Sequence, residues 1–481
     1  MNPVVVIIRR GVFLLLVAVV PTLLCGSRTG DIKAPAVAGA FYPADAVALR
    51  QTVDRTLSAV HPAKGELRPF AVIVPHAGYE YSAAVAAEGF ARLKGQPVSK
   101  VILVGPSHHV PLNGVALYPG DGMRTPLGVV PVAVKVVRQM AHDAEQVRLD
   151  AAPFAREHSL EVQLPFIQRA FGTATPVVPI LVGSPTRESL AAVTRDVGRI
   201  LREDPHALLV ISTDLSHYHD QTTARKMDNR MIDAVERLST RDLERLSQHG
   251  QGEMCGVWPA VYGIAAARAA GGSRSVLYRA ATSGDVTGDR KRVVGYAAMG
   301  IERRRMTRAQ KQQLLELARR TIGNRVRGEN LPDSATREPI FRTDGAAFVT
   351  LNGPGGRLRG CIGTIIPNSS LYESVIRNAA TTASGDPRFK PVAREELAGL
   401  SVEVSVLSPL TPISDPAGIV IGRDGVYLEK GGQSAVFLPQ VPVEAKWDLP
   451  TYLAQLAVKA GLPPDGWRGA RLSVFTAEVL K

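Results

Sequence analysis

The sequence predicts two domains: an α/β domain with a mostly parallel sheet over residues 31–302, followed by an α+β domain over residues 306–481. A chain of 481 residues is too long for one ordinary hydrophobic core. In the first half, short apolar runs alternate with helical patterns, as they do in α/β domains. A charged stretch over residues 302–307 ends this pattern, and a less regular succession of helix and strand patterns follows.

The composition is that of a globular protein and argues against nucleic acid as a partner. Apolar residues make up 45% of the chain and charged residues 21%, enough to form ordinary cores. Aromatic residues make up 5%, too few for a surface that stacks nucleobases. The net charge of +13 is spread without a base-reading motif, so we expect a solvated, arginine-rich surface. The three cysteines form no CxxC pair, which argues against a disulfide framework or a zinc ribbon.

Residues 1–26 resemble an export signal or membrane anchor. Arg9 and Arg10 precede an apolar run that ends at Leu24, about the length of a signal-peptide core. The segment admits a cleaved signal, a twin-arginine signal, a lipid tether on Cys25, or a start site assigned too far upstream. We expect an exported or membrane-anchored protein on the periplasmic side, and a cytoplasmic one if the start site is wrong.

The first domain has four strand predictions and two clear helix predictions. Short apolar runs suited to buried parallel strands lie at 70–74, 100–104, 177–182 and 207–211. Helical patterns lie between them at 81–93 and 189–201. This alternation predicts the parallel sheet.

Polar residues follow three of these strands. His76 comes just after the first strand and His108 just after the second, while Asp214 and His217 follow the fourth. Ligands of open α/β sheets bind beyond the carboxyl ends of the strands. A single histidine is more often structural, but the joint pattern predicts a site at this edge of the sheet.

Two further segments add candidate groups. On a helix, His158 and Glu161 would lie on one face and present an imidazole and a carboxylate to a common point; the alternative is a surface ion pair. Cys255 precedes a helical pattern over 259–270, and a helix N-terminus lowers the pKa of a thiol. The alternative for a single cysteine is a small buried apolar residue.

The first domain resembles the Memo family, which is similar in fold to the class III extradiol dioxygenases of the LigB type. Six segments match in order and spacing, at 36–43, 75–79, 105–110, 157–161, 212–217 and 254–256. The resemblance implies metal ligands at His76, His108 and Cys255. It implies pocket residues at His158, Asp214 and His217.

These residue types imply chemistry at one metal ion. Two imidazoles and one anionic ligand leave open positions, as in sites where Fe(II) activates oxygen. A thiolate from Cys255 replaces the carboxylate of the related dioxygenases and favours copper or zinc more strongly, so we expect Fe(II) with copper or zinc as alternatives. His158 and His217 are predicted to act as general acid and base, and Asp214 to orient one of them.

The second domain resembles the Amme family. A helical pattern runs over 314–326 and a strand pattern over 401–407, and the motifs at 358–364, 386–389, 436–441 and 459–463 carry the resemblance. Its candidate site residues are Arg359, Cys361, Asp386 and Arg388. They would line a small pocket, or else hold turns together, which is the interpretation we favour.

Three functions remain open at this point, and whether the chain is an enzyme is uncertain. The first is a metal-dependent oxidoreductase of dioxygenase type acting on an unknown small molecule. The second is a protein that binds copper or iron for redox or metal handling. The third is an adaptor for a radical-SAM protein, because the AmmeMemoRadiSam system brings these three components together. Export argues against the third function, since radical-SAM clusters need a reducing compartment.

Overall fold

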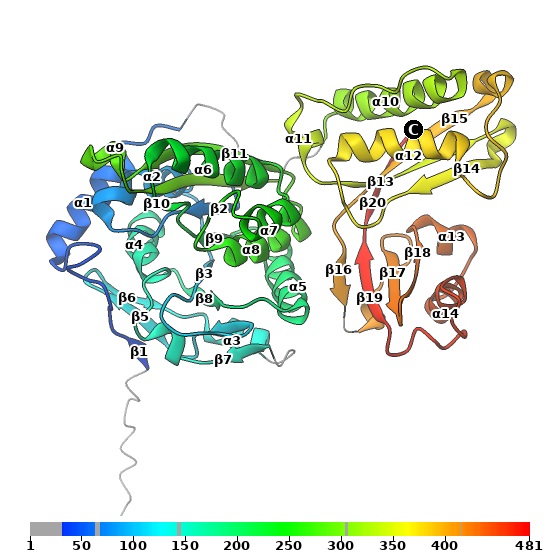
Figure 1. Ribbon diagram of the computed structural model, residues 1–481. Helices are drawn as coiled ribbons and strands as arrows, with labels where there is room; N and C mark the ends of the chain where they lie inside the picture. The colour runs from blue at the N-terminus through cyan, green and yellow to red at the C-terminus, as the bar shows by residue number, and fades with distance from the viewer. Residues whose placement is uncertain (1–30, 63–67, 142–145, 304–305, 414) are drawn as a thin grey trace, which may run out of the picture.

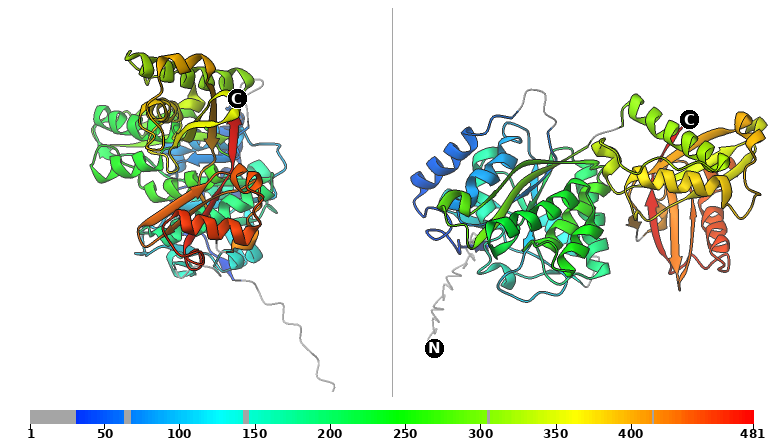
Figure 2. Two further views of the ribbon diagram at one scale, coloured as in Figure 1. Left: turned by 90° about the vertical axis from the view of Figure 1, so that its right-hand side faces the viewer. Right: turned by 45° about the horizontal axis from the view of Figure 1, so that its top comes forward.

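The computed structural model describes residues 31–481 except 63–67, 142–145, 304–305 and 414. The two domains follow one another along the chain and lie side by side (Figures 1 and 2). The signal or anchor prediction for residues 1–26 lies outside the described residues. Within the described part, no helix is long and apolar enough to cross a membrane.

The first domain is built on a nine-stranded sheet whose centre is parallel. The order along the sheet is β10-β12-β2-β9-β3-β8-β4-β7, with β11 also paired to β12. The parallel centre consists of β2 (Ala71–Val74), β9 (Ala207–Ser212), β3 (Lys100–Pro106) and β8 (Val177–Val182). The flanks consist of β10 (His217–His219), β11 (Arg274–Thr282), β12 (Val293–Glu302), β4 (Val115–Leu117) and β7 (Val147–Leu149). The α/β class is confirmed, and the four predicted strands form its centre.

Helices cover both faces of this sheet. They are α1 (Ala46–Ser58), α2 (Tyr79–Ala91), α3 (Val134–Ala141), α4 (Leu164–Phe171), α5 (Arg187–Glu203), α6 (Gln221–Glu236), α7 (Thr240–Gln248), α8 (Val257–Ala269) and α9 (Gly284–Thr287). A small sheet of β1 (Ile32–Lys33), β5 (Gly122–Thr125) and β6 (Gly128–Pro131) lies apart from the large one. The short helical turns η1 (Ala152–Phe154) and η2 (Glu161–Gln163) precede α4.

Two glycines show how closely α2 and α8 approach opposite faces. A Cβ on Gly89 of α2 would lie 2.8 Å from Val74 Cγ1, and a Cβ on Gly263 of α8 would lie 2.3 Å from Ile211 Cδ1. The β2–β9 register pairs Val74 with Ser212, one residue after Ile211. Since successive side chains of a strand point to opposite faces, the two helices lie on opposite sides of the sheet.

The second domain contains two four-stranded antiparallel sheets, which confirms the α+β prediction. The first comprises β13 (Ala346–Asn352), β14 (Leu358–Gly363), β15 (Ser401–Leu407) and β20 (Ala477–Leu480). The second comprises β16 (Thr411–Ile413), β17 (Gly425–Lys430), β18 (Gln433–Phe437) and β19 (Arg471–Phe475).

Five helices and three short turns accompany these sheets in the described part of the second domain. The helices are α10 (Arg308–Arg327), α11 (Pro339–Arg342), α12 (Leu371–Ser384), α13 (Gln440–Glu444) and α14 (Leu449–Lys459). The turns are η3 (Pro354–Gly356), η4 (Arg394–Gly399) and η5 (Pro416–Gly418). Helices α10 and α12 pack on the first sheet and α14 on the second, so each sheet has its own apolar core.

Polar contacts join the two domains around Asp344. Its carboxylate accepts a hydrogen bond from the Ser239 hydroxyl at 2.9 Å, and its carbonyl oxygen accepts one from the Arg268 guanidinium at 2.5 Å. Arg342 forms an ion pair with Asp233 at 2.9 Å. The first domain therefore contacts the second through α6, the segment before α7, and the end of α8.

Candidate metal centre

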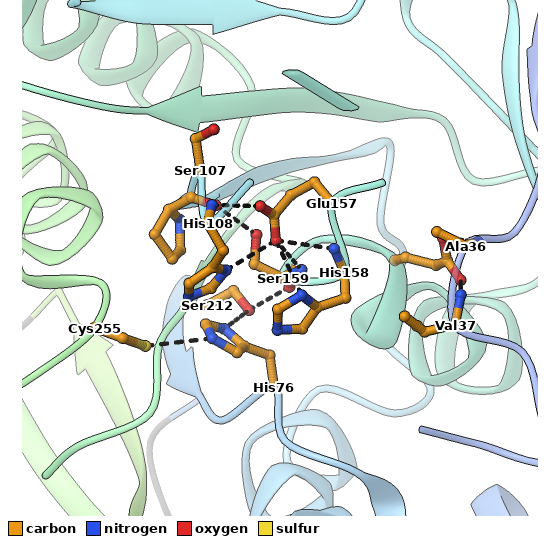
Figure 3. Close-up of polar contacts among 12 residues, drawn as sticks. Ala36, Val37, His76, Ser107, His108, Glu157, His158, Ser159, Ser212 and Cys255 are labelled. Atoms are coloured by element: carbon orange, nitrogen blue, oxygen red, sulfur yellow. Dashed lines mark hydrogen bonds and ion pairs between the residues drawn. The ribbon is translucent and has the colours of Figure 1, made fainter. Parts of the chain in front are cut away.

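Neighbouring strands carry the predicted site residues to one edge of the sheet. His76 follows β2, Asp214 follows β9, and His108 follows β3, and these three strands are adjacent and parallel. Their carboxyl ends therefore meet, as the sequence predicted. His158 comes from the loop before η2 and Cys255 from the residue before the N-cap of α8. Segments distant in sequence thus converge on one place (Figure 3).

Three histidines of this site form a cluster that could hold one metal ion. One ring nitrogen from each of His76, His108 and His158 lies within 4.8 Å of the other two. The ring centroids of His76 and His108 are 5.2 Å apart, those of His76 and His158 are 5.4 Å apart, and those of His108 and His158 are 4.6 Å apart. The donor set is compatible with a transition metal, because imidazole is a common ligand of iron, copper and zinc.

Cys255 reaches the same cluster through His76. Its Sγ lies 3.3 Å from His76 Nε2. Two ligands bound to one metal at about 2.1 Å for nitrogen and 2.3 Å for sulfur lie about 3.1–3.6 Å apart. The observed separation fits a shared ion. The ligand role of Cys255 stays a prediction, because the close histidine cluster does not include its sulfur.

The expected lowering of the Cys255 pKa is wrong. Burial raises the pKa of the thiol to about 12, and the carboxylate of Asp214 adds to this effect. The hydrogen bond that Sγ accepts from the backbone N–H of Asp214 at 3.2 Å is too weak to offset the loss of solvent. The helix N-terminus, which can be recognised locally in the sequence, has a smaller effect on this pKa than burial, which depends on the whole fold. A bound cation would supply the charge that favours the thiolate.

A serine fixes which ring nitrogen of His76 carries hydrogen. The Ser212 hydroxyl donates its hydrogen to the Ser159 carbonyl oxygen at 2.6 Å, since a carbonyl oxygen only accepts. Ser212 Oγ therefore accepts from His76 Nδ1, 3.0 Å away, and also from Gln163 Nε2 at 2.9 Å. Burial lowers the pKa of His76 well below its ordinary value, so the ring is neutral. His76 Nε2 then keeps its lone pair and faces Cys255 Sγ (Figure 3).

Glu157 acts on His108 in the same way, and sequence reasoning missed this role. Glu157 Oε1 lies 3.0 Å from His108 Nδ1, and Oε2 accepts the backbone N–H of His108 at 2.6 Å. Burial opposes ionisation of Glu157, but hydrogen bonds from His108 and Ser159 outweigh it and hold its pKa well below the ordinary value. A carboxylate only accepts, so His108 Nδ1 carries hydrogen and Nε2 is available to a metal. The only sequence feature that could have indicated this role is that Glu157 directly precedes His158.

Of the remaining pocket residues, Asp214 is buried and His158 and His217 are partly buried. Burial lowers the pKa of His158 to about 4 and also lowers the pKa of His217, so both rings are neutral at neutral pH. Burial raises the pKa of Asp214 to about 7. Asp214 Oδ1 accepts the backbone N–H of His76 at 2.8 Å, so it positions the chain at His76. This differs from the expected contact with His158 or His217, because the carboxylate accepts hydrogen bonds from the backbone that follows β2.

Glu161 does not face the site, contrary to expectation. His158 lies in a loop and Glu161 begins η2, so the helical spacing assumed for the pair does not exist. The Glu161 carboxylate is buried and forms a 2.7 Å ion pair with Lys33. It also accepts the Tyr42 hydroxyl and the backbone N–H groups of residues 36 and 37. Glu161 therefore holds the N-terminal segment onto the domain, and it is not a surface ion pair.

A second group of possible ligands adjoins the first but is poorly suited to a metal. It comprises His109, Glu157 and His158. Glu157 Oε1 already accepts from His108 Nδ1, from the N–H of His158 at 2.9 Å and from the N–H of Ser159 at 2.8 Å. The lone pairs of the Glu157 carboxylate are used, so the better metal site is the one around His76 and His108.

The candidates of the second domain contact one another and neighbouring loops. Asp386 accepts the backbone N–H of Cys361 at 2.9 Å and pairs with Arg388 at 2.8 Å. Arg359 pairs with Glu396 at 2.7 Å. These contacts are those expected of residues that hold turns together, and a reactive role for them stays a prediction.

Comparisons with known proteins cover both halves of the chain. A family model described as Memo-like protein matches residues 33–300, and a model described as AMMECR1 matches residues 315–480. A MEMO1 family protein of Aquifex aeolicus is 39% identical over 268 residues, covering 56% of this chain and 98% of the relative. A MEMO1 family protein of Methanothermobacter thermautotrophicus is 35% identical over 274 residues, covering 55% of this chain and 99% of the relative. The crystal structure of an uncharacterized protein from Pyrococcus horikoshii is 41% identical, covers 35% of this chain and 89% of its own, and has a TM-score of 0.34.

Proposed function

The chain belongs to the Memo-like protein family and continues into an AMMECR1 domain, and from this premise we propose that its first domain is a mononuclear metal-dependent oxidoreductase. Both resemblances seen in the sequence are thereby confirmed. The proposed substrate is a small molecule, and the proposed reaction type is that of the dioxygenases. The observation that carries the proposal is the convergence of three histidines and a cysteine at the carboxyl ends of adjacent strands.

His76, His108 and Cys255 are the proposed ligands. Hydrogen bonds to Ser212 and Glu157 leave the Nε2 atoms of both histidines with a lone pair toward the centre. When bound, Fe(II) would supply redox chemistry with oxygen, which no side chain of the chain supplies by itself. Burial of His76 and Asp214 keeps bulk water from that side of the site, whereas the side chain of His108 is 27% exposed.

His158 and His217 are the proposed proton carriers. His158 Nδ1 lies 3.4 Å from Glu157 Oε1, and His158 Nε2 is the atom proposed to take a proton from a substrate hydroxyl. A neutral imidazole is required for this step, and burial keeps both rings neutral. Asp214 would keep the turn at His76 in place through its backbone hydrogen bond.

Metal handling without turnover is the second candidate, and the thiol of Cys255 is the observation that favours it. A thiolate is a softer ligand than the carboxylate of related dioxygenases and prefers copper or zinc. In that case the protein would bind copper or iron tightly and consume no oxygen.

The partner and the location complete the proposal. We propose that a radical-SAM protein of the same system interacts with the fusion, and that residues 1–26 direct export or anchoring on the periplasmic side. These two proposals conflict when they are combined, because radical-SAM clusters require reducing conditions. Fractionation of cells that carry the tagged full chain, followed by affinity capture from each fraction, distinguishes them.

Metal content tests the central proposal. The full chain is purified without oxygen as wild type, as Cys255→Ala, and as Cys361→Ala, which removes the other cysteine of the described region as a matched control. We expect near-stoichiometric iron in wild type and Cys361→Ala, a sharp loss in Cys255→Ala, and oxygen uptake with catechol-like compounds. Copper or zinc without oxygen uptake supports metal handling. Absence of metal from every form after reconstitution contradicts both candidates.

A further inference from the structure

The boundary between the two domains forms a second candidate site, which is open to solvent and remote from the histidines. Two adjoining hollows of about 830 and 730 Å3 lie there. They share six lining residues, which are Arg199, Arg202, Thr411, Arg423, Asp424 and Val474. The first domain contributes α5 and the end of α8, on the side that faces β16 and β19 of the second (Figure 1). We call these two hollows the interdomain cavity.

The interdomain cavity has the size and the apolar wall of a small-molecule site. Ligand sites commonly measure about 300–1,000 Å3, are mostly apolar, and often lie between domains. Both domains supply the apolar wall of the larger hollow, through Leu238, Leu371, Val406 and Phe475. A ligand with an apolar body would be covered from both sides.

Three arginines line the part that the two hollows share. Arg423 is neutralised by Asp424, with bonds of 2.8 and 2.7 Å, and Arg199 pairs with Glu203 at 3.2 Å. Each of these guanidiniums retains further N–H donors. The charges of Arg423 and Arg199 are largely balanced by their carboxylate partners. These two residues therefore contribute oriented hydrogen-bond donors rather than net positive charge.

Arg202 supplies the net charge. Its guanidinium donates to the Ala269 carbonyl oxygen at 2.8 Å, and no carboxylate of the described residues lies within ion-pairing distance of it. Partial burial lowers the pKa of Arg202; the neighbouring Glu203 opposes this shift, and repulsion by Arg199 and Arg423 adds to it. A guanidinium beside two others and without a carboxylate at ion-pairing distance is a favourable place for an anion.

We propose that the interdomain cavity binds a small organic anion, with its carboxylate or phosphate group on Arg202, Arg199 and Arg423 and its apolar body against the shared wall. Both head groups offer the same chemistry, which is two or more oxygens that accept charge-assisted hydrogen bonds. The proposal is independent of the metal centre. Residues of both domains would hold the ligand, so neither domain would bind it alone.

Calorimetric titration of the full chain tests this proposal. The probes are phthalate and phenyl phosphate, which carry an apolar ring and differ in head group, and inorganic phosphate, which lacks the ring. We expect at least one ring-bearing probe to bind, and inorganic phosphate to bind at least about tenfold more weakly, since it leaves the apolar wall unused. The preferred head group identifies the ligand class. Added salt should weaken binding.

Two variants and one control locate the site. Arg202→Ala removes the unpaired charge and should weaken binding about tenfold or more. Thr411→Trp fills the cavity from the second domain and should abolish binding although every arginine remains. Arg319→Ala, an exposed arginine on α10 outside the cavity, should leave binding unchanged. Thermal unfolding confirms that each variant folds. No binding of any probe at millimolar concentration, or equal binding by Arg202→Ala and wild type, would overturn the proposal.

Discussion

Replacing Ser212 by alanine isolates the mechanism that orients His76. The substitution removes the acceptor of the His76 Nδ1 hydrogen bond, 3.0 Å long, without touching a proposed ligand. Nδ1 then has no fixed partner, and the ring is free to exchange its hydrogen between the two nitrogens. The tautomer with hydrogen on Nε2 cannot bind a metal through that atom.

The expected loss follows from what the neighbouring groups of metal ligands contribute. Removal of such a partner typically lowers metal affinity about 10–100-fold, which is about 1.4–2.7 kcal/mol. The upper part of this range is expected, because Ser212 is fully buried and water cannot replace its oxygen. The substitution also leaves one Gln163 Nε2 hydrogen without this acceptor, and the protein should lose about 1–3 kcal/mol of stability.

Metal affinity is measured by competition with a chelator of known affinity, for the full chain and the variant. Ser159→Ala is the matched control, since its buried hydroxyl donates to the Pro106 carbonyl oxygen at 2.8 Å and forms no hydrogen bond with His76. Both variants should lose similar stability, but only Ser212→Ala should lose metal affinity. Equal affinities for wild type and Ser212→Ala would refute the argument from hydrogen-bond direction.

Three other predictions concern folding. Glu161→Gln removes a buried charge that pairs with Lys33, so we expect a loss of about 3–5 kcal/mol in urea unfolding, with the exposed Glu188→Gln as the control. Gly263→Ala would place a Cβ 2.3 Å from Ile211 Cδ1. We expect the free energy of unfolding to fall by about 1–2 kcal/mol after the gain in helix propensity is included. An unchanged melting temperature would contradict this packing. The hydrogen bond and ion pair with Arg388 lower the pKa of Asp386 to about 2 from 3.8. Its contribution to stability is therefore full above pH 3.8 and is lost as the pH falls through about 2, so the stability difference between wild type and Asp386→Asn should shrink over that window.

The centre of the first domain could be predicted because its strands are buried on both faces. The run 177–182 is apolar throughout, and the structure has β8 over the same residues. The flanking strands β10 and β7 have three residues each, too few to show an alternating pattern of apolar and polar residues. They form because β12 and β4 lie next to them, which is information that no local window of sequence contains.

The site shows the same division between local and distant information. His76 and His108 could be found because they follow predicted strands that parallel pairing brings together. Ser212 was harder to recognise, although it is the one polar residue at the end of an apolar run. Its role depends on Ser159 and Gln163, 53 and 49 residues away along the chain. The predicted lowering of the Cys255 pKa was wrong for a related reason, since burial depends on every element packed around the thiol.

Helix α8 joins the two candidate sites of the molecule. Its N-cap residue, Gly256, follows Cys255 and donates its N–H to Thr213 Oγ1 at 2.9 Å. Near its other end Arg268 contacts the second domain at Asp344 and lines the interdomain cavity. Its 13 residues span about 20 Å, and Gly263 locks its middle against Ile211. Helix α8 therefore runs from the residue next to the proposed ligand Cys255 to the contact with the second domain. The fusion thus connects its AMMECR1 domain to the proposed metal ligand that is least firmly defined by the histidine cluster.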